Sequence, residues 1–227
     1  MTSTQLINYI EKSFKKKSNL IIANKQEAYL RNQFEFYGLI SSERKKITQS
    51  LVTKYRFKSV KDFQETIKIL WNKQQREFQY TAQEFVLENL NYFKINDIKL
   101  FEFMIINKSW WDTIDFIAPK ILGSYFKSNP EIIDVQINKW LNSNNLWLQR
   151  SCVLFQLKYK EKLNTELLSQ IIYFLTDSNE FFINKSIGWI LREYSKTNKD
   201  WVIDFVKQNK LSNLSKRESL KYIKKNK

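Results

Sequence analysis

The sequence of 227 residues contains no histidine and a single cysteine, Cys152. Without histidine the chain cannot build a Ser-His-Asp triad, a Cys-His pair or a histidine-ligated metal site. One cysteine cannot form an intrachain disulfide or hold an iron–sulfur cluster, which fits a reducing compartment. Its apolar setting in SCVLFQL indicates a small core residue. We therefore expect no metal and no cofactor.

Glycine and proline are almost as scarce, with three of the first and two of the second. No glycine-rich phosphate loop exists, which excludes nucleotide sites of that kind, and so few turn formers argue against a sheet protein. No apolar run approaches the roughly 18 residues of a membrane span, and the start MTSTQLINYIEKSFKKK lacks the apolar core of a signal peptide. We expect no membrane association.

Basic residues are abundant: 38 Lys and Arg stand against 23 Asp and Glu, a formal net charge of +15. A composition of 43% hydrophobic and 15% aromatic residues predicts a folded chain with a sizeable core. The excess of positive charge favours a polyanionic partner, either nucleic acid or an acidic membrane surface. Of the two, nucleic acid is the one we expect.

Apolar residues recur at helical spacing nearly everywhere. In PEIIDVQINKWL, Ile133, Ile137, Trp140 and Leu141 follow one another at i, i+4, i+7 and i+8, one stripe of a helix. The segment NDIKLFEFMIINK is more evenly apolar, as in a helix packed on two sides. We predict roughly a dozen helices joined by short polar links, and no strand.

Helix-start signals accompany these segments. Ser59 precedes Asp62 by three residues, and Asn164 stands before TELLSQII. Ser215 and Glu218 have the spacing of a capping box. Each of these positions is predicted to begin a helix.

Four marked residues recur at a nearly constant interval. Trp71, Trp111, Arg150 and Trp189 lie 40, 39 and 39 residues apart. Helix pairs repeating at about 40 residues are typical of a HEAT-like solenoid, whose equivalent positions line one curved surface. We therefore expect Trp111, Arg150 and Trp189 to face a common groove, in a single domain spanning residues 1–227.

The stretch SWWDTIDFIAPK, residues 109–120, puts two tryptophans beside two aspartates. Trp111 and Asp115 stand at i and i+4 and share a helix face, whereas Trp110 points about 100° away and is assigned to the core. Asp112 is expected to cap a helix beginning near Thr113. Asp115 has two readings, a catalytic carboxylate or a surface ion-pair partner. Other tryptophans are assigned to packing: Trp71, Trp140, Trp147 and Trp201.

Long strings of the chain resemble a known family. The segments NKSWWDTIDFI, WLQRSCVLFQLKYK and EFFINKSIGWILREYSKTN, with LSKRESLKYIKKN near the end, are similar to the HEAT-repeat DNA alkylation repair enzymes, the AlkD-like DNA glycosylases. The resemblance covers nearly the whole chain. It implies an all-α, C-shaped solenoid with a concave basic groove that grips duplex DNA, and removal of cationic N-alkylated purines, mainly 3-methyladenine and 7-methylguanine.

The resemblance also implies roles for single residues. Asp115 matches the family's catalytic aspartate, with Trp111, Arg150 and Trp189 beside it, and Tyr29 is a looser match to an aromatic residue of the same cleft. Arg150 has two possible roles, holding a backbone phosphate or steering Asp115 through a salt bridge. Basic residues near these motifs are assigned to DNA phosphates: Lys158, Lys160, Lys185, Arg192 and Arg217.

Three functions compete for this sequence. The leading one is a DNA glycosylase of base excision repair, monofunctional because no lysine stands out as a Schiff-base nucleophile. It would act as a monomer in the bacterial cytoplasm, associated with the nucleoid. The first alternative is an inactive HEAT-repeat module that binds distorted or branched DNA. The second alternative, a scaffold for a protein partner, is disfavoured by the charge of +15.

Overall fold

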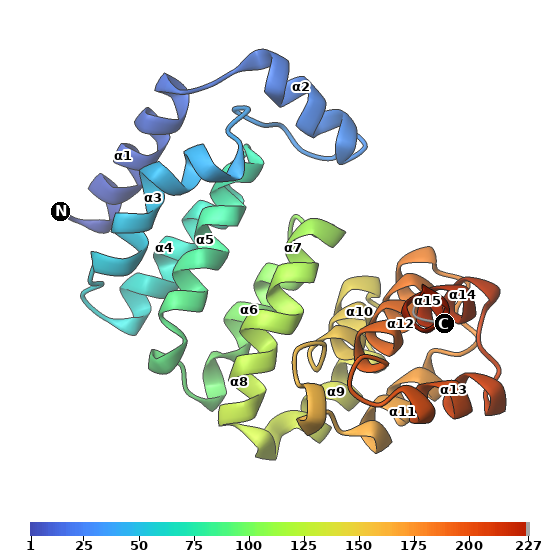
Figure 1. Cartoon of the computed structure of the whole chain (residues 1–227). Coiled ribbons are helices and arrows are strands. Elements are labelled where there is room, and N and C mark those ends of the chain that lie inside the picture. Colours follow the sequence, from blue (N-terminus) through green and yellow to red (C-terminus); the bar gives the residue numbers. More distant parts are fainter. Residues whose placement is uncertain (226–227) are drawn as a thin grey trace. The chain divides into compact units, whose positions relative to one another are not determined.

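A computed structural model describes residues 1–225 of the chain, and over these residues the fold is helical (Figure 1). The β-type pairing recorded there is an isolated bridge between Glu35 and Gln75. The all-α class predicted from the sequence is confirmed. None of the helices within residues 1–225 combines the length and the apolar character that crossing a membrane requires.

Contacts gather the chain into two compact units, Met1–Leu100 and Phe101–Lys227. In the first, α1 packs on α3 and α4, and α5 packs on the same two helices. The helix α2 is different, because Ala23 alone is buried among its ten residues. The helices of this unit are α1 (Ser3–Lys16), α2 (Leu20–Tyr29), α3 (Ser41–Lys54), α4 (Val60–Asn72), α5 (Arg76–Glu88) and two 3₁₀ turns, η1 (Leu90–Tyr92) and η2 (Ile95–Asp97).

A buried carboxylate fastens the segment that leaves α2. The carboxylate of Glu77, on α5, accepts hydrogen bonds from the backbone N–H groups of Tyr37, Gly38 and Leu39 at 2.9–3.1 Å. Gly38 has a φ of 85°, and a Cβ there would lie 2.0 Å from the carbonyl oxygen of Asn19. The chain can therefore turn tightly over α2 only with glycine at this position.

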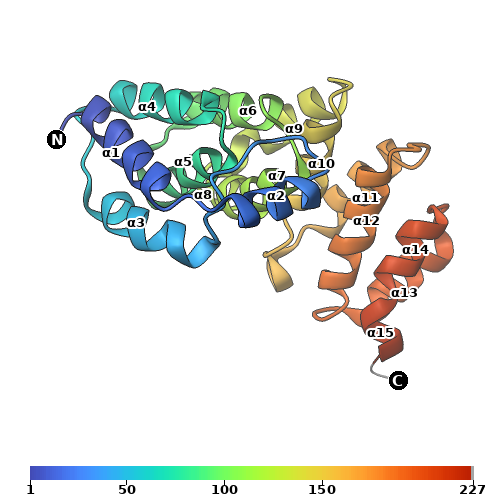
Figure 2. The same cartoon turned by 90° about the horizontal axis from the view of Figure 1, so that it is seen from above.

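The second unit is built around α10, which packs against α7, α9, α11 and α12, while α12 in turn packs against α13 and α14 (Figure 2). The helix α6 (Ile98–Ile106) begins in the first unit and continues into the second. The other elements of the second unit are α7 (Trp111–Phe116), the π-helical turn η3 (Ile117–Leu122), α8 (Gly123–Ser128), η4 (Pro130–Ile132), α9 (Ile133–Leu141), α10 (Leu146–Leu154), η5 (Lys160–Lys162), α11 (Thr165–Phe174), α12 (Phe181–Tyr194), α13 (Lys199–Gln208), α14 (Asn213–Ser219) and α15 (Lys221–Lys225). Neighbouring and next-but-one helices pack together, of which α10 with α12 and α12 with α14 are the most extensive pairs, and this arrangement is consistent with a helical-repeat solenoid.

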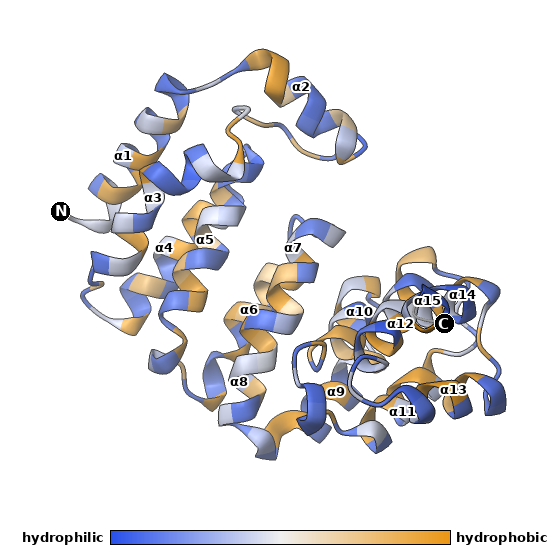
Figure 3. Cartoon of the chain, viewed as in Figure 1, coloured by the Kyte–Doolittle hydropathy of each residue, from blue (hydrophilic) through white to orange (hydrophobic). Residues whose placement is uncertain are grey.

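Apolar and polar residues are interspersed along the helices of each unit (Figure 3). Of the stripe predicted in α9, Ile137, Trp140 and Leu141 are buried, and Ile133 at the start of the helix is half-buried. Trp71 is also fully buried, near the end of α4. The residues spaced by about 40 occupy different places in their helices, Trp111 at the start of α7 and Trp189 well inside α12, so the interval does not mark one repeated helix position.

Two of the predicted helix starts are confirmed and one is wrong. Ser59 caps α4 by accepting the Asp62 N–H, and Asn164 caps α11. At the third, α14 begins three residues earlier than predicted, with Ser212 as its cap in place of Ser215. Ser215 is buried instead and donates its hydroxyl to the carbonyl oxygen of Asn184 on α12 at 2.9 Å. A tertiary contact has thus taken the side chain that the local pattern assigned to capping.

Gly188 sets the distance between α12 and α14. A Cβ at this position would lie 2.4 Å from the Cβ of Glu218 and 3.0 Å from the carbonyl oxygen of Ser215. Neither atom is the end of a flexible side chain, so the two helices must separate to admit a methyl group. The glycine of the IGW string is explained by this close approach.

Gly188→Ala is expected to destabilise the protein in spite of the better helix propensity of alanine. Overpacking costs about 1–3 kcal/mol, whereas the gain in propensity is about 1 kcal/mol. The free energy of unfolding is measured by urea titration. Lys207→Ala, at an exposed position of α13, serves as the control and should change this free energy by less than about 0.5 kcal/mol. A Gly188→Ala protein more stable than wild type would contradict the close approach.

Candidate functional site

Arg150, on α10, bonds side-on to Asp115, on α7. Its Nε donates to Asp115 Oδ1 at 3.0 Å, and its Nη2 donates to Oδ1 at 2.8 Å and to Oδ2 at 3.0 Å. The Arg150 side chain is 3% exposed and that of Asp115 is 20% exposed. Of the two roles considered for Arg150, the geometry is that of steering Asp115. Oδ2 takes only one of the three bonds and so retains the greater capacity to accept another.

An aromatic cluster and a backbone carbonyl hold the other side of Arg150. Its Nη1 donates to the carbonyl oxygen of Phe182 at the start of α12, and its guanidinium carbon lies 5.8 Å from the Phe182 ring centre. Trp110 and Trp147 pack on the same ring, with ring centres 5.4 Å and 5.1 Å from it. Trp110 therefore packs in an aromatic cluster with Trp147 and Phe182, but it is half-buried and not among the fully buried core residues to which the sequence assigned it.

The helix that carries Asp115 starts two residues earlier than predicted. It begins at Trp111, with the extended residue Trp110 as its cap and no capping side chain, so the capping role expected of Asp112 is wrong. Asp112 lies in the first turn, where a negative charge suits the helix dipole. Trp111 and Asp115 share a face, as expected, and both are half-buried.

A proline widens the helix directly after Asp115. An α-helical bond to the Asp115 carbonyl would come from residue 119, and Pro119 has no N–H to give. The segment is π-helical instead, and the Gly123 N–H reaches back five residues to the carbonyl of Ala118. Single π-helical turns are frequent at functional sites.

Burial raises the pKa of Asp115 above the usual aspartate value. The nearby positive charge of Arg150 and its hydrogen bonds act in the opposite direction and lower the pKa, while the negative charge of Asp112 raises it further. Loss of solvation outweighs the ion pair. The carboxylate is therefore a stronger base than an ordinary aspartate in water.

Asp112→Asn should shift any activity that needs ionised Asp115 to lower pH. A raised carboxyl pKa means that the proton is held to a higher pH, so the activity falls as pH decreases through that pKa. Removing the charge of Asp112 lowers the pKa of Asp115, and the acidic limb of the pH profile moves down. The profile of kcat/KM is measured beside that of Asp134→Asn, an exposed position on α9, which should match wild type. An unmoved limb in Asp112→Asn would exclude Asp115 as the titrating group.

One face of α12 carries several of the predicted residues. Phe182, Lys185, Trp189 and Arg192 follow at i, i+3, i+7 and i+10, and all four are half-buried. Lys185 and Arg192 are not isolated cations, because both form ion pairs with Glu218 on α14, at 2.9 Å and 2.8 Å. From the sequence, Phe182 had no assigned role and Glu218 was placed only in a capping box, although the interval of seven residues from Phe182 to Trp189 indicates a shared helix face.

The remaining predicted DNA contacts are exposed. Lys158, Lys160 and Arg217 lie in the second unit, and Lys160 has a left-handed φ of 52° at the start of η5. Tyr29 is the last residue of α2 in the first unit and is strongly exposed. Their contact with DNA stays a prediction.

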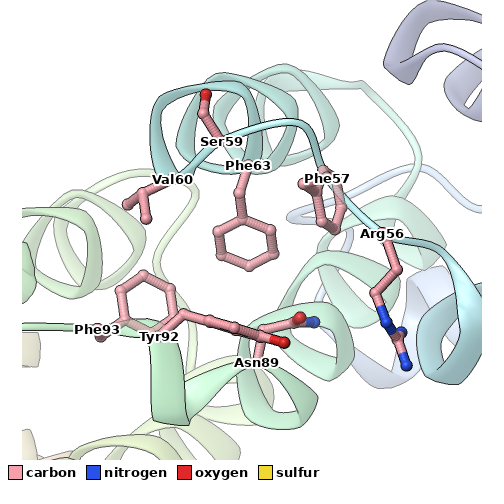
Figure 4. A pocket seen from close by; sticks show the side chains of 8 residues that line it. All are labelled: Arg56, Phe57, Ser59, Val60, Phe63, Asn89, Tyr92 and Phe93. Atoms are coloured by element: carbon pink, nitrogen blue, oxygen red, sulfur yellow. The ribbon is translucent and has the colours of Figure 1, made fainter.

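Two cavities lie outside the Asp115 site. One, of about 270 Å³, is in the first unit and is lined by the aromatic rings of Phe57, Phe63, Tyr92 and Phe93 together with Arg56 and other residues (Figure 4). The other, of about 300 Å³, lies between the residues around η5 and the end of α12, and Lys160 is part of its lining. Among residues 1–225 no group of His, Cys, Asp and Glu side chains is arranged to hold a metal ion.

A family model and a solved structure are each similar to most of the chain. A family model described as DNA alkylation repair enzyme matches residues 10–223. Among solved structures, the chain is similar to a predicted DNA alkylation repair enzyme from Enterococcus faecalis, with 33% sequence identity, a TM-score of 0.85, and coverage of 91% of this chain and 96% of that chain. No curated protein sequence matches.

Proposed function

The chain belongs to the DNA alkylation repair enzyme family, and from this premise we propose that it is a monofunctional DNA glycosylase. Its substrates are purines alkylated at N3 or N7, such as 3-methyladenine and 7-methylguanine, in duplex DNA. It hydrolyses the bond between the base and the sugar as the first step of base excision repair. Family membership indicates DNA as its partner.

The observation that carries the proposal is the steered carboxylate of Asp115. Three hydrogen bonds from Arg150 fix its plane, and Arg150 is itself held by the Phe182 carbonyl. The side chain nevertheless stays 20% exposed. A carboxylate that serves only to pair a buried arginine has no need of an exposed edge, whereas one that acts on a substrate does.

The chemistry suits a site without histidine. A purine alkylated at N3 or N7 carries a positive charge, so it leaves as a neutral base and needs no proton from an acid. As the glycosidic bond breaks, its electrons go to the base and positive charge develops on the sugar. Asp115 stabilises this charge, and a fixed group of this kind is often the largest contribution to catalysis. Water then adds to the sugar carbon and loses a proton, for which Asp115 is the acceptor.

The two tryptophans supply apolar walls for a cationic ligand. Trp111 is one helical turn from Asp115 on α7, and Trp189 lies on the half-buried face of α12. The face of an indole ring attracts cations by about 0.5–2 kcal/mol. In this mechanism they contact the sugar or the charged base while Asp115 acts on the sugar.

The test is a panel of duplexes with three kinds of lesion. We expect release of 7-methylguanine and of a bulky cationic N-alkylpurine, because the charge on the base drives departure and the site selects for that charge. We expect no release of uracil, hypoxanthine or 1,N6-ethenoadenine, because a neutral leaving group requires an acid. Freed bases are quantified by chromatography, and intact abasic strands show that no strand cleavage follows.

Each outcome of the panel is informative. Release of a neutral base, or rejection of the bulky cation, would mean that the site reads shape rather than charge. Duplex binding without release of any base would instead favour the non-catalytic alternative, a module that binds distorted DNA.

A further inference from the structure

Three cations of the second unit converge on one buried carboxylate. Glu218, on α14, is 2% exposed, and its Oε1 bonds Lys185 Nζ at 2.9 Å and Lys221 Nζ at 2.5 Å. Its Oε2 bonds Arg192 Nη1 at 2.8 Å. Burial opposes ionisation of Glu218, but the hydrogen bonds from Lys221 and Lys185 prevail and lower its pKa to about 2. The carboxylate is thus charged at any physiological pH, and two positive charges of the cluster remain uncompensated.

The convergence is built into α12. Lys185, Gly188 and Arg192 stand at i, i+3 and i+7 and form one stripe of the helix. Gly188 is the point at which Glu218 lies against α12, with the close approach described above. The side chains one turn before and one turn after it therefore both reach the same carboxylate. Trp189 stands next to this stripe.

All three cations keep donors for an outside ligand. The side chain of Lys185 is 38% exposed, that of Arg192 30% and that of Lys221 50%. Each lysine has three N–H groups and arginine has five, and each cation makes one contact with Glu218. The two lysine nitrogens share Oε1, so they lie no more than 5.4 Å apart. This spacing lets one small oxyanion contact both.

We propose that Lys185, Arg192 and Lys221 form a binding site for one phosphate of the DNA backbone, and that Glu218 is the positioning residue that organises it. The inference rests on the proposed function, since it takes duplex DNA as the ligand. The phosphodiester sits on the solvent side of the three cations, beside Trp189, and Glu218 sits on the protein side. Lys221 and Glu218 have no role in the proposed base release.

Glu218 has two opposed effects on DNA binding. Its negative charge repels a phosphate, which weakens binding. It also holds three long side chains together, so that their ordering does not have to occur during binding. Because the carboxylate is buried behind cations that neutralise it, we expect organisation to exceed repulsion. A variant without the negative charge of Glu218 should then bind DNA less tightly than wild type. The change in net charge alone would predict tighter binding.

The experiment measures the dissociation constant of a duplex as a function of salt for wild type, Glu218→Gln and Glu166→Gln. Glu166 is an exposed glutamate of α11, so its variant has the same change in charge without the cluster. We expect Glu218→Gln to bind about tenfold more weakly, as loss of a charge-assisted contact implies, with a log–log salt slope smaller by about 0.9, the value for one phosphate. Glu166→Gln should bind as tightly as wild type or slightly more tightly.

Folding is separated from binding by titrating the fraction of active protein and by a second variant. This variant is the double substitution Lys185→Met and Lys221→Met, which leaves Glu218 paired with Arg192. The salt slope of its DNA binding should also fall. The control is Lys210→Met, which removes a lysine from an exposed pair with Asp177 and should change the salt slope little. The inference is overturned if the salt slope is unchanged in both cluster variants, or if Glu218→Gln binds DNA more tightly than wild type. The proposed function is tested separately, and it stands if the wild-type protein releases bases. A wild-type protein with no affinity for duplex DNA overturns both.

Discussion

Asp115→Asn is expected to lower the rate of base release by about 10²–10³-fold, the usual cost of removing one group that stabilises transition-state charge. Asparagine keeps the shape of the side chain, and its carbonyl oxygen still accepts from Arg150. What disappears is the negative charge beside the developing sugar cation. Single-turnover release of 7-methylguanine from saturated complexes measures the chemical step apart from binding.

The affinity of Asp115→Asn for duplex DNA should change little, or increase slightly, because a negative charge has been removed. Asp134→Asn, with the same change at an exposed position, is the matched control and should release bases at the wild-type rate. Wild-type release by Asp115→Asn would show that another group stabilises the sugar cation. Equal loss in the two variants would point to an effect of net charge.

Arg150→Met is expected to have the largest effect on stability. It leaves the carboxylate of Asp115 without its ion partner and removes the side-chain donor to the Phe182 carbonyl. Breaking a fully buried pair in this way costs about 3–5 kcal/mol, and the partial exposure of Asp115 sets the expected loss at about 3 kcal/mol. Base release should fall as well, because the carboxylate loses its fixed plane. Urea unfolding measures the first effect and single-turnover release the second.

Two further variants separate charge from geometry. Arg150→Lys keeps the charge but cannot bond side-on with several N–H groups, so its base release should stay below that of wild type. The double variant Asp115→Asn with Arg150→Met contains no uncompensated charge, and it should recover much of the stability lost by Arg150→Met alone. It should recover none of the activity. If Arg150→Met unfolds at the wild-type urea concentration, the ion pair contributes nothing to the fold.

Local patterns in the sequence were sufficient to predict the helical fold, two of the helix caps and the part of the site that lies on α7. The stripe of α9 and the caps at Ser59 and Asn164 were predicted correctly, because helix periodicity and capping depend on residues within one or two turns. The shared face of Trp111 and Asp115 was predicted for the same reason. By contrast, Asp112 was misassigned as a cap. The cap of α7 is Trp110, which is extended and makes no side-chain hydrogen bond to the helix. A helix start of this kind has no capping residue that could be recognised in the sequence.

By itself, then, the sequence determined that this protein is helical and basic, free of histidine chemistry, and equipped with an aspartate one turn from a tryptophan. Only the tertiary structure decided what the long-range partners do. The structure pairs Arg150 with Asp115, 35 residues away. It places Glu218, which the sequence assigned to a capping box, at the centre of a cluster of three cations. Such pairings depend on which helices pack together and at what distance, as Gly188 shows for α12 and α14. The spacing of residues along the chain does not determine the distance between two helices, because helix packing brings together residues that are far apart in the sequence and follow no common periodicity.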